Sequence, residues 1–159
     1  MKHLLSAVLL VLLLGCSAEP DSGPGKIRWD REVCTRCAMS VSEHNYAAQI
    51  RHKVAGQKSK LYVFDDIGCA IIWLDQQPWK DDPANEIWVA AYQDGQWLDA
   101  RKAWYVPGKI TPMGYGLGAS ARQEPGAMDF AAARKQVYQV EQQTHAHRGG
   151  HSHTGETAQ

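Results

Sequence analysis

Three sulfur-bearing side chains lie close together in the stretch CTRCAM, residues 34–39. Cys34 and Cys37 form a Cys-x-x-Cys pair, and Met39 adds a thioether. Such a pair can form a structural or redox disulfide, act as a thioredoxin-like active site, or bind a soft metal. A structural zinc site needs four closed ligands, and the chain has no second Cys-x-x-Cys. Met39 favours Cu(I), because Cu(I) accepts thioethers and zinc makes little use of them. A thiol–disulfide redox protein remains the alternative.

Two further sulfurs are candidates of lower rank. Met113 lies in TPMG, a Gly/Pro turn that can present a side chain at the surface, although methionine also fills gaps in cores. Together with Cys34 and Cys37, Cys69 makes three cysteines after residue 16, an odd number that cannot all pair in disulfides within the chain. It lies off the apolar stripe of its predicted helix, so we expect a second packed layer to bury it. A disulfide from Cys69 to Cys34 or Cys37 would block metal loading.

The C-terminal stretch is rich in histidine. Four of the seven histidines fall within nine residues, namely His145, His147, His151 and His153. No apolar pattern supports a fold there, so the sequence predicts a disordered tail over residues 142–159. His-x-His pairs bind Cu(II), Ni(II) or Zn(II) loosely, so the tail is either a metal-loading arm or a polar extension.

The N-terminus has the pattern of a bacterial lipoprotein signal. A short basic start precedes the apolar run Leu4–Leu14, which is too short to span a bilayer. The run ends in LLGC, which resembles a lipobox and predicts removal of residues 1–15 and lipidation of Cys16. Ser17 favours the outer membrane. Residues 16–26 are expected to form a flexible tether to a lipid bilayer, with the domain facing the periplasm.

Strand and helix patterns alternate along the rest of the chain. The first group is strand, strand, helix, strand, at Tyr46–Arg51, Leu61–Phe64, 65–77 and Glu86–Gln93. The second group repeats that order at Gln96–Val106, Tyr115–Ala121, Pro125–Gln136 and Val137–Val140. The pattern predicts an α+β domain over residues 27–141, built as two tandem ββαβ modules over about 27–94 and 95–141 with mainly antiparallel sheet.

Charge and composition exclude several functions. The chain has 17 basic and 17 acidic side chains, so nothing favours nucleic acid as a partner. No second apolar run reaches membrane-spanning length. No Ser/His/Asp or paired-carboxylate arrangement stands out, so we predict that the protein is not an enzyme.

Four segments resemble one known family. CTRCAM, FDDIGCAIIWL, QWLDARKAWYVPG and ITPMGYGLGA occur in the order and spacing of the NosL family, over Ile27–Val140. The resemblance implies two ββαβ modules and a periplasm-facing Cu(I) chaperone for the copper–sulfide centre of nitrous oxide reductase. With the residue chemistry, it makes Cys34, Cys37, Met39 and Met113 the expected Cu(I) ligands, and a homodimer around a shared ion stays open. Ala38 departs from the glycine that similar members carry.

Overall fold

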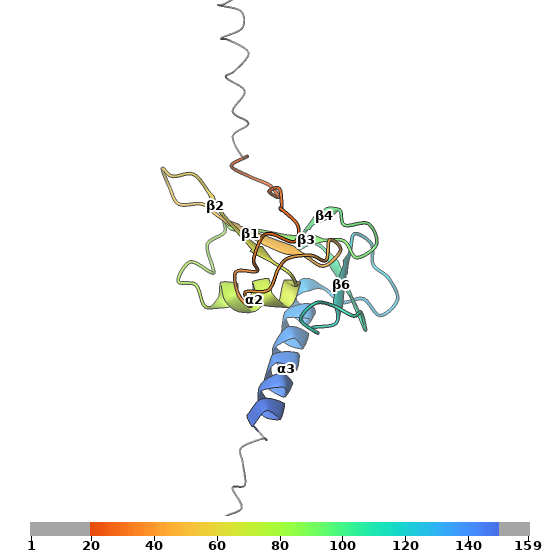
Figure 1. Ribbon diagram of the computed structural model, residues 1–159. Coiled ribbons are helices and arrows are strands. Elements are labelled where there is room, and N and C mark those ends of the chain that lie inside the picture. The colour runs from red at the N-terminus through yellow and green to blue at the C-terminus, as the bar shows by residue number, and fades with distance from the viewer. Residues whose placement is uncertain (1–19, 150–159) are drawn as a thin grey trace, which may run out of the picture.

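The computed structural model describes residues 20–149 as two antiparallel sheets and two helices (Figure 1). The strands are β1 (Ala48–His52), β2 (Lys60–Phe64), β3 (Glu86–Ala90), β4 (Trp97–Asp99), β5 (Trp104–Pro107) and β6 (Leu117–Ser120). The helices are α2 (Ile67–Asp75) and α3 (Phe130–Gly149). The strand order is β2-β1-β3-β4 in one sheet and β5-β6 in the other, so the predicted α+β class is confirmed.

The four-stranded sheet carries α2 on one face. Tyr62 and Phe64 of β2 lie on that face, and the ring of each contacts Trp73 of α2, with centroids 4.4 and 5.4 Å apart. Asp66 caps the helix, because its carboxylate accepts a hydrogen bond of 2.9 Å from the N–H of Gly68. The elements expected from Tyr46 to Gln93 are therefore present in the expected order.

The second half of the chain differs from the predicted repeat. The expected strand Val137–Val140 is wrong, because α3 runs through it to Gly149. Ala133 and Val137 are buried four residues apart, so the apolar pattern continues with helical period. The expected tail at residues 142–159 is helical as far as residue 149, and the rest lies outside the described residues.

The long extended segment Gln96–Val106 is also interrupted. It divides into β4 and β5 at a turn where the Asp99 carboxylate accepts from the N–H of Arg101 at 3.0 Å. The two sheets meet through one parallel bridge between Ala91 and Ala119. The second half is therefore a β-hairpin followed by a long helix, and no second ββαβ unit forms among the described residues.

The segment before the sheet is held in place from Asp21 onward. The backbone of Gly25 exchanges two hydrogen bonds with the buried side chain of Gln49, at 2.8 and 2.9 Å. Arg51 donates to the carbonyl of Gly23 at 2.9 Å. We call residues 20–26 the N-terminal strap. The expected flexibility is wrong for this part of the tether, because buried side chains of β1 satisfy its backbone.

The strap and α2 cover opposite faces of the sheet (Figure 1). Gln49 and Arg51, which bind the strap, alternate along β1 with Ala48 and Ile50, and successive side chains of a strand point to opposite faces. The predicted signal and Cys16 lie outside the described residues. Between residues 20 and 149 no helix has the length and apolar character needed to cross a membrane.

Candidate metal site

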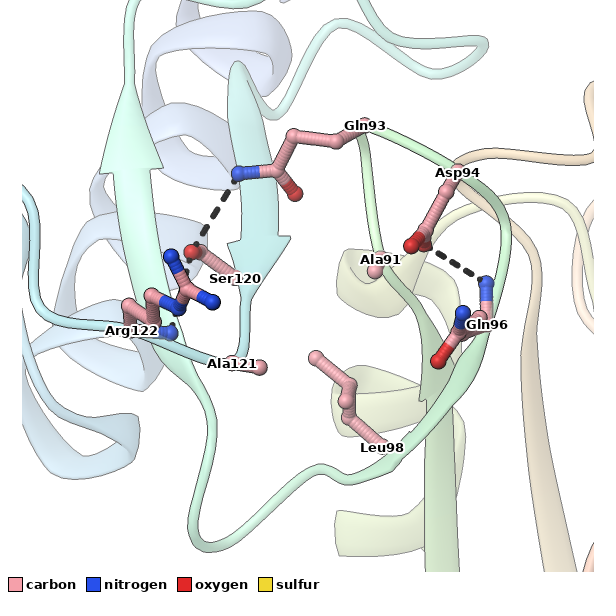
Figure 2. Close-up of a pocket in the computed structure, with 8 residues that line it drawn as sticks. All are labelled: Ala91, Gln93, Asp94, Gln96, Leu98, Ser120, Ala121 and Arg122. Atoms are coloured by element: carbon pink, nitrogen blue, oxygen red, sulfur yellow. Dashed lines mark hydrogen bonds between the residues drawn. The ribbon is translucent and has the colours of Figure 1, made fainter.

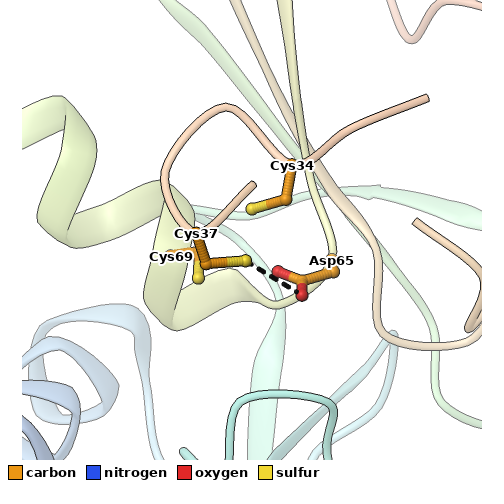
Figure 3. A group of neighbouring side chains, drawn as sticks. All are labelled: Cys34, Cys37, Asp65 and Cys69. Carbon is orange, nitrogen blue, oxygen red and sulfur yellow. Dashed lines mark hydrogen bonds between the residues drawn. The ribbon is translucent and has the colours of Figure 1, made fainter. Parts of the chain in front are cut away.

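Four potential ligands converge from three segments of the chain. The sulfurs of Cys34, Cys37 and Cys69 and a carboxylate oxygen of Asp65 all lie within 4.8 Å of one another (Figure 3). The first two come from the CTRCAM loop, Asp65 follows β2 directly, and Cys69 lies near the start of α2. All three cysteines are free thiols. We call these four residues the thiol cluster.

The CTRCAM loop is a closed turn at the end of a small hairpin. Val33 and Ser40 form an antiparallel bridge, and the N–H of Cys34 donates to the carbonyl of Met39 at 2.8 Å. The N–H of Ala38 donates back to the carbonyl of Cys34 at 3.0 Å. The Cys-x-x-Cys pair therefore lies in a turn, whereas a thioredoxin-like pair opens a helix.

Ala38 adopts a left-handed conformation, with φ of +61°. Glycine would adopt this conformation without the steric penalty that Cβ imposes on alanine. The turn closes around alanine nonetheless.

Asp65 supplies a buried carboxylate with an unpaired oxygen. One oxygen, Oδ2, accepts from the thiol of Cys37 at 3.3 Å. The other, Oδ1, is buried with no hydrogen-bond partner among the described residues. The N–H of Thr35 donates to the carbonyl of Val63 at 2.8 Å, which holds the loop against β2 beside this carboxylate. A buried, unsatisfied carboxylate oxygen next to three sulfurs fits a bound cation.

The three thiols of the cluster differ in pKa. Hydrogen bonding from the Cys69 thiol lowers the pKa of Cys34 to about 6. Burial raises the pKa of Cys37 to about 12. The pKa of Cys69 is raised because its thiol proton serves as the donor to Cys34 and because the group is buried. Cys34 is therefore the most acidic of the three thiols, and the thiolate is the form of cysteine that binds metals.

A polar network links the cluster to α3. Arg36 contacts the sulfur of Cys69 at 3.9 Å, donates to the Tyr115 hydroxyl at 2.9 Å and forms an ion pair with Glu141. The Tyr115 hydroxyl donates to Glu141 at 2.6 Å, and His145 lies 3.2 Å from the same carboxylate. Arg36 therefore places a positive charge beside Cys69 and joins it to the helix.

The two methionines lie on segments that border the cluster. Met39 is 51% exposed, at the end of the turn that begins with Cys34. Met113 is partly buried, and its N–H donates to the buried carboxylate of Asp66 at 3.3 Å, beside a bond of 2.6 Å from Thr111. Burial raises the pKa of Asp66 to about 6. The TPMG turn is thereby fixed to the residue next to Asp65.

Sequence reasoning did not select two members of the thiol cluster. Cys69 was expected in a second packed layer or in a disulfide, and Asp65 was not among the expected ligands. Asp65 and Cys69 are four residues apart around a helix start, a spacing that could have paired them. Of the four tail histidines, His145 is exposed on α3, His147 falls within that helix, and His151 and His153 lie outside the described residues.

A polar hollow elsewhere lacks metal-binding chemistry. It has a volume of about 410 Å³ and lies between the β3–β4 turn and the end of β6 (Figure 2). Gln93 donates to the Ser120 hydroxyl at 3.3 Å across it, and Asp94 and Arg122 supply its only charges. With no thiol or imidazole in its lining, it does not compete with the thiol cluster as a copper site.

Comparison with known protein families gives a match that covers most of the chain. No curated protein matches the sequence. The model of the NosL family matches residues 28–151, which include every member of the thiol cluster. The chain therefore belongs to the NosL family, a family of accessory copper-binding proteins and not of enzymes.

Proposed function

We propose that this protein binds Cu(I) at the thiol cluster and delivers it to nitrous oxide reductase for assembly of the copper–sulfide centre. The observation that supports this most is the convergence of three thiols beside the Asp65 carboxylate, whose Oδ1 has no hydrogen-bond partner in the described part of the chain. Family membership points to copper, and thiolate is the donor that Cu(I) prefers. Acyl chains on Cys16 would hold the domain at a membrane of the cell envelope, with the outer membrane favoured by Ser17.

The first ligand in this proposal is Cys34. Its thiolate is available near neutral pH, because hydrogen bonding from Cys69 lowers its pKa to about 6. Cys37 and Cys69 bind after losing their protons, and Asp65 accepts a hydrogen bond from Cys37 before that step. Two or three soft ligands satisfy Cu(I), so the cluster leaves a choice of ligands, which suits a protein that must release its metal.

Met39 and Met113 are the thioether ligands in this proposal. The half-exposed side chain of Met39 is unbranched and flexible. The backbone carbonyl of Met39 accepts a hydrogen bond from the N–H of Cys34, which holds the residue next to the cluster. The side chain can reach a bound ion from the solvent side and leave again during transfer. Met113 approaches from the turn fixed to Asp66. Neither thioether carries a proton, so their contribution does not depend on pH.

The test is a Cu(I) titration of the reduced protein against a competing chelator. Cys34→Ser should weaken binding by roughly a hundredfold or more, because even outer-shell partners of metal ligands commonly contribute ten- to a hundredfold. Cys16→Ser is the matched control, since it makes the same change outside the cluster and should leave the affinity unchanged. Met39→Leu should weaken binding, and Met128→Leu, which lies against the core near Tyr105, should not. Undiminished binding by Cys34→Ser would eliminate this site.

Zinc binding is a second candidate, favoured by the carboxylate. Three thiolates and one carboxylate oxygen make four ligands, the number that a tetrahedral Zn(II) site uses. Asp65→Asn separates the two metals, because Cu(I) makes little use of a hard oxygen ligand. We expect this variant to weaken Zn(II) binding by roughly tenfold or more and to change Cu(I) binding far less. Equal loss for both metals would show that Asp65 supports the fold of the site and is not a ligand.

The thiol–disulfide redox alternative makes a different forecast. A redox protein should show exchange at a defined potential, undisturbed by Met39→Leu, and no strong preference for Cu(I). The position of Cys34 and Cys37 in a turn does not provide the helix N-terminus that activates thioredoxin-like pairs. We therefore place Cu(I) binding ahead of it.

A further inference from the structure

The tip of the β1–β2 hairpin is cationic and carries an exposed apolar side chain. A turn closes it, with the N–H of Gln57 donating to the carbonyl of Val54 at 3.0 Å and Gly56 at φ of +75°. Val54 is 44% exposed. Three lysines lie within six positions of it in the sequence, namely Lys53, Lys58 and Lys60. Glu86 pairs with the first of these at 3.7 Å, whereas the other two are exposed.

A hollow lies between this hairpin and the N-terminal strap. Its volume is about 630 Å³, and the charged residues in its lining are Arg51, Lys58, Lys60 and Asp21. The Asp21 carboxylate accepts from the N–H of Ser59 at 2.6 Å, so one wall of the hollow is also the join between strap and hairpin. Lys58 is exposed at its rim, whereas the buried Arg51 already donates to the Gly23 carbonyl and the Ser59 hydroxyl, and the ammonium of Lys60 lies 4.9 Å from the centroid of the Tyr62 ring. The exposed lysine charge at the tip is suited to an anionic group such as a phosphate.

The strap determines where this surface lies relative to the lipid anchor. Asp21 is five residues from Cys16, and a fully extended chain of that length spans about 18 Å. A hydrogen bond from the N–H of Ser59 to the Asp21 carboxylate joins the hairpin to the strap. A lipid on Cys16 therefore keeps the hairpin tip within a short distance of the bilayer surface.

The thiol cluster lies at the other end of the same strand. β2 begins at Lys60, beside the hollow, and Asp65 of the cluster follows its last residue. Five residues of extended strand span about 17 Å. The helix α2, which carries Cys69, covers the face opposite the strap (Figure 1). With the hairpin tip on the membrane, the cluster is directed away from it.

We propose that the hairpin tip binds the anionic phospholipid headgroups of the membrane that holds the protein. This inference rests on the proposed lipid anchor at Cys16 and is independent of copper. The exposed Lys58 and Lys60 attract headgroup phosphates, and Val54 enters the interface between headgroups and acyl chains. The contact converts a loose tether into a fixed orientation, with the thiol cluster presented to a protein partner.

The test uses the full lipidated protein on phosphatidylcholine vesicles, with and without phosphatidylglycerol. Hydrogen–deuterium exchange over residues 53–60 should slow by roughly fivefold or more on the anionic vesicles only, which is about the effect of one basic residue at an anionic surface. High salt should reverse the protection. The double variant Lys58→Gln/Lys60→Gln should abolish it. Lys102→Gln, a change in a lysine that is 84% exposed on the β4–β5 turn, is the matched control and should not.

The other outcomes are distinct. Suppose that mass spectrometry shows Cys16 to be acylated and that hydrogen–deuterium exchange over residues 53–60 is the same on both kinds of vesicle. This result would overturn the docking surface and leave the anchor intact. Protection by inorganic phosphate on phosphatidylcholine vesicles would show a free-phosphate site and would also overturn it. An unmodified Cys16 would overturn the anchor and this proposal together, while Cu(I) binding by the thiol cluster would remain to be judged on its own titration.

Discussion

The thiol cluster and the histidine-bearing end of α3 are two donor-rich regions joined by one polar network. Arg36 contacts Cys69 in the first region and pairs with Glu141 next to the second. The cluster is largely buried, and its ligands come from three segments of the chain. His145 is 68% exposed, and Glu141 on the same helix is its described partner.

This difference concerns preorganisation more than the number of donors. The thiol cluster is held by backbone hydrogen bonds of the CTRCAM loop, by β2 and by α2, so binding a metal there costs little ordering. On α3 the spacing of Glu141 and His145 supplies at most two donors to a site open to water. The buried region should therefore bind Cu(I) tightly, and the helix end should bind harder divalent ions weakly.

The largest expected effect is the pH dependence of Cu(I) affinity at the thiol cluster. A thiol must lose its proton to bind as thiolate, so the affinity rises with pH until the pKa of that thiol is passed. Cys34, with a pKa near 6, adds little above neutrality. Cys37 and Cys69 have raised pKa values, so each one that binds adds about tenfold per pH unit. The measurement is competition titration of Cu(I) from pH 6 to about 9.

The same titration counts the thiolates. If one of the two thiols with a raised pKa binds Cu(I) together with Cys34, the affinity increases about a hundredfold between pH 7 and about 9. A curve that is level above about pH 7 would show that Cys34 is the single thiolate ligand and that thioethers complete the site. The affinity of a site made of imidazoles would stay level over this pH range, because histidine is already neutral above its usual pKa near 6.5.

Prediction from sequence succeeded where local pattern decides structure. β1, β2, α2 and β3 have strong period-two or helical patterns bounded by turn residues, and all four are present. Residues 137–140 alternate weakly, and such a short run cannot distinguish strand from helix by itself. The continuing stripe of Ala133 and Val137 decides it, because α3 packs along α2.

The same limit applies to the site. Cys34 and Cys37 are close in sequence, so the motif identified them directly. Cys69 joins them only through packing between segments more than thirty positions apart. A single apolar stripe assigned Cys69 to an outer layer, but α2 is covered on several sides: Gly68 packs so closely on the ring of Tyr115 that a Cβ there would lie 2.2 Å from it. Tertiary packing, which no sequence period records, brings Cys69 into the thiol cluster.

The second prediction removes the histidine region. A chain ending at Gln143 loses all four tail histidines and keeps Glu141, so the ion pair with Arg36 survives. We expect Cu(I) affinity to stay within about twofold and the weaker binding of Cu(II) or Zn(II) to fall, because imidazole is a harder donor than thiolate. Chelator competition with Cu(I) and calorimetry with Zn(II) measure the two. Loss of Cu(I) binding on truncation would make the histidines the primary site and reverse the comparison.

The smallest effect concerns the strain that the CTRCAM turn contains and α3 does not. Ala38 adopts φ of +61°, a conformation that costs a residue with Cβ roughly 1–2 kcal/mol, whereas glycine adopts it freely. Glycine also loses more backbone entropy on folding, so Ala38→Gly should raise the free energy of unfolding by a net of about 1 kcal/mol or less. Ala133→Gly is the matched control: the same substitution at a buried helical position of α3 should destabilise the protein. Urea unfolding of both variants measures the two signs. If Ala38→Gly lowers stability as Ala133→Gly does, the left-handed conformation at position 38 carries no strain, and the turn around Cys34 is as relaxed as the helix.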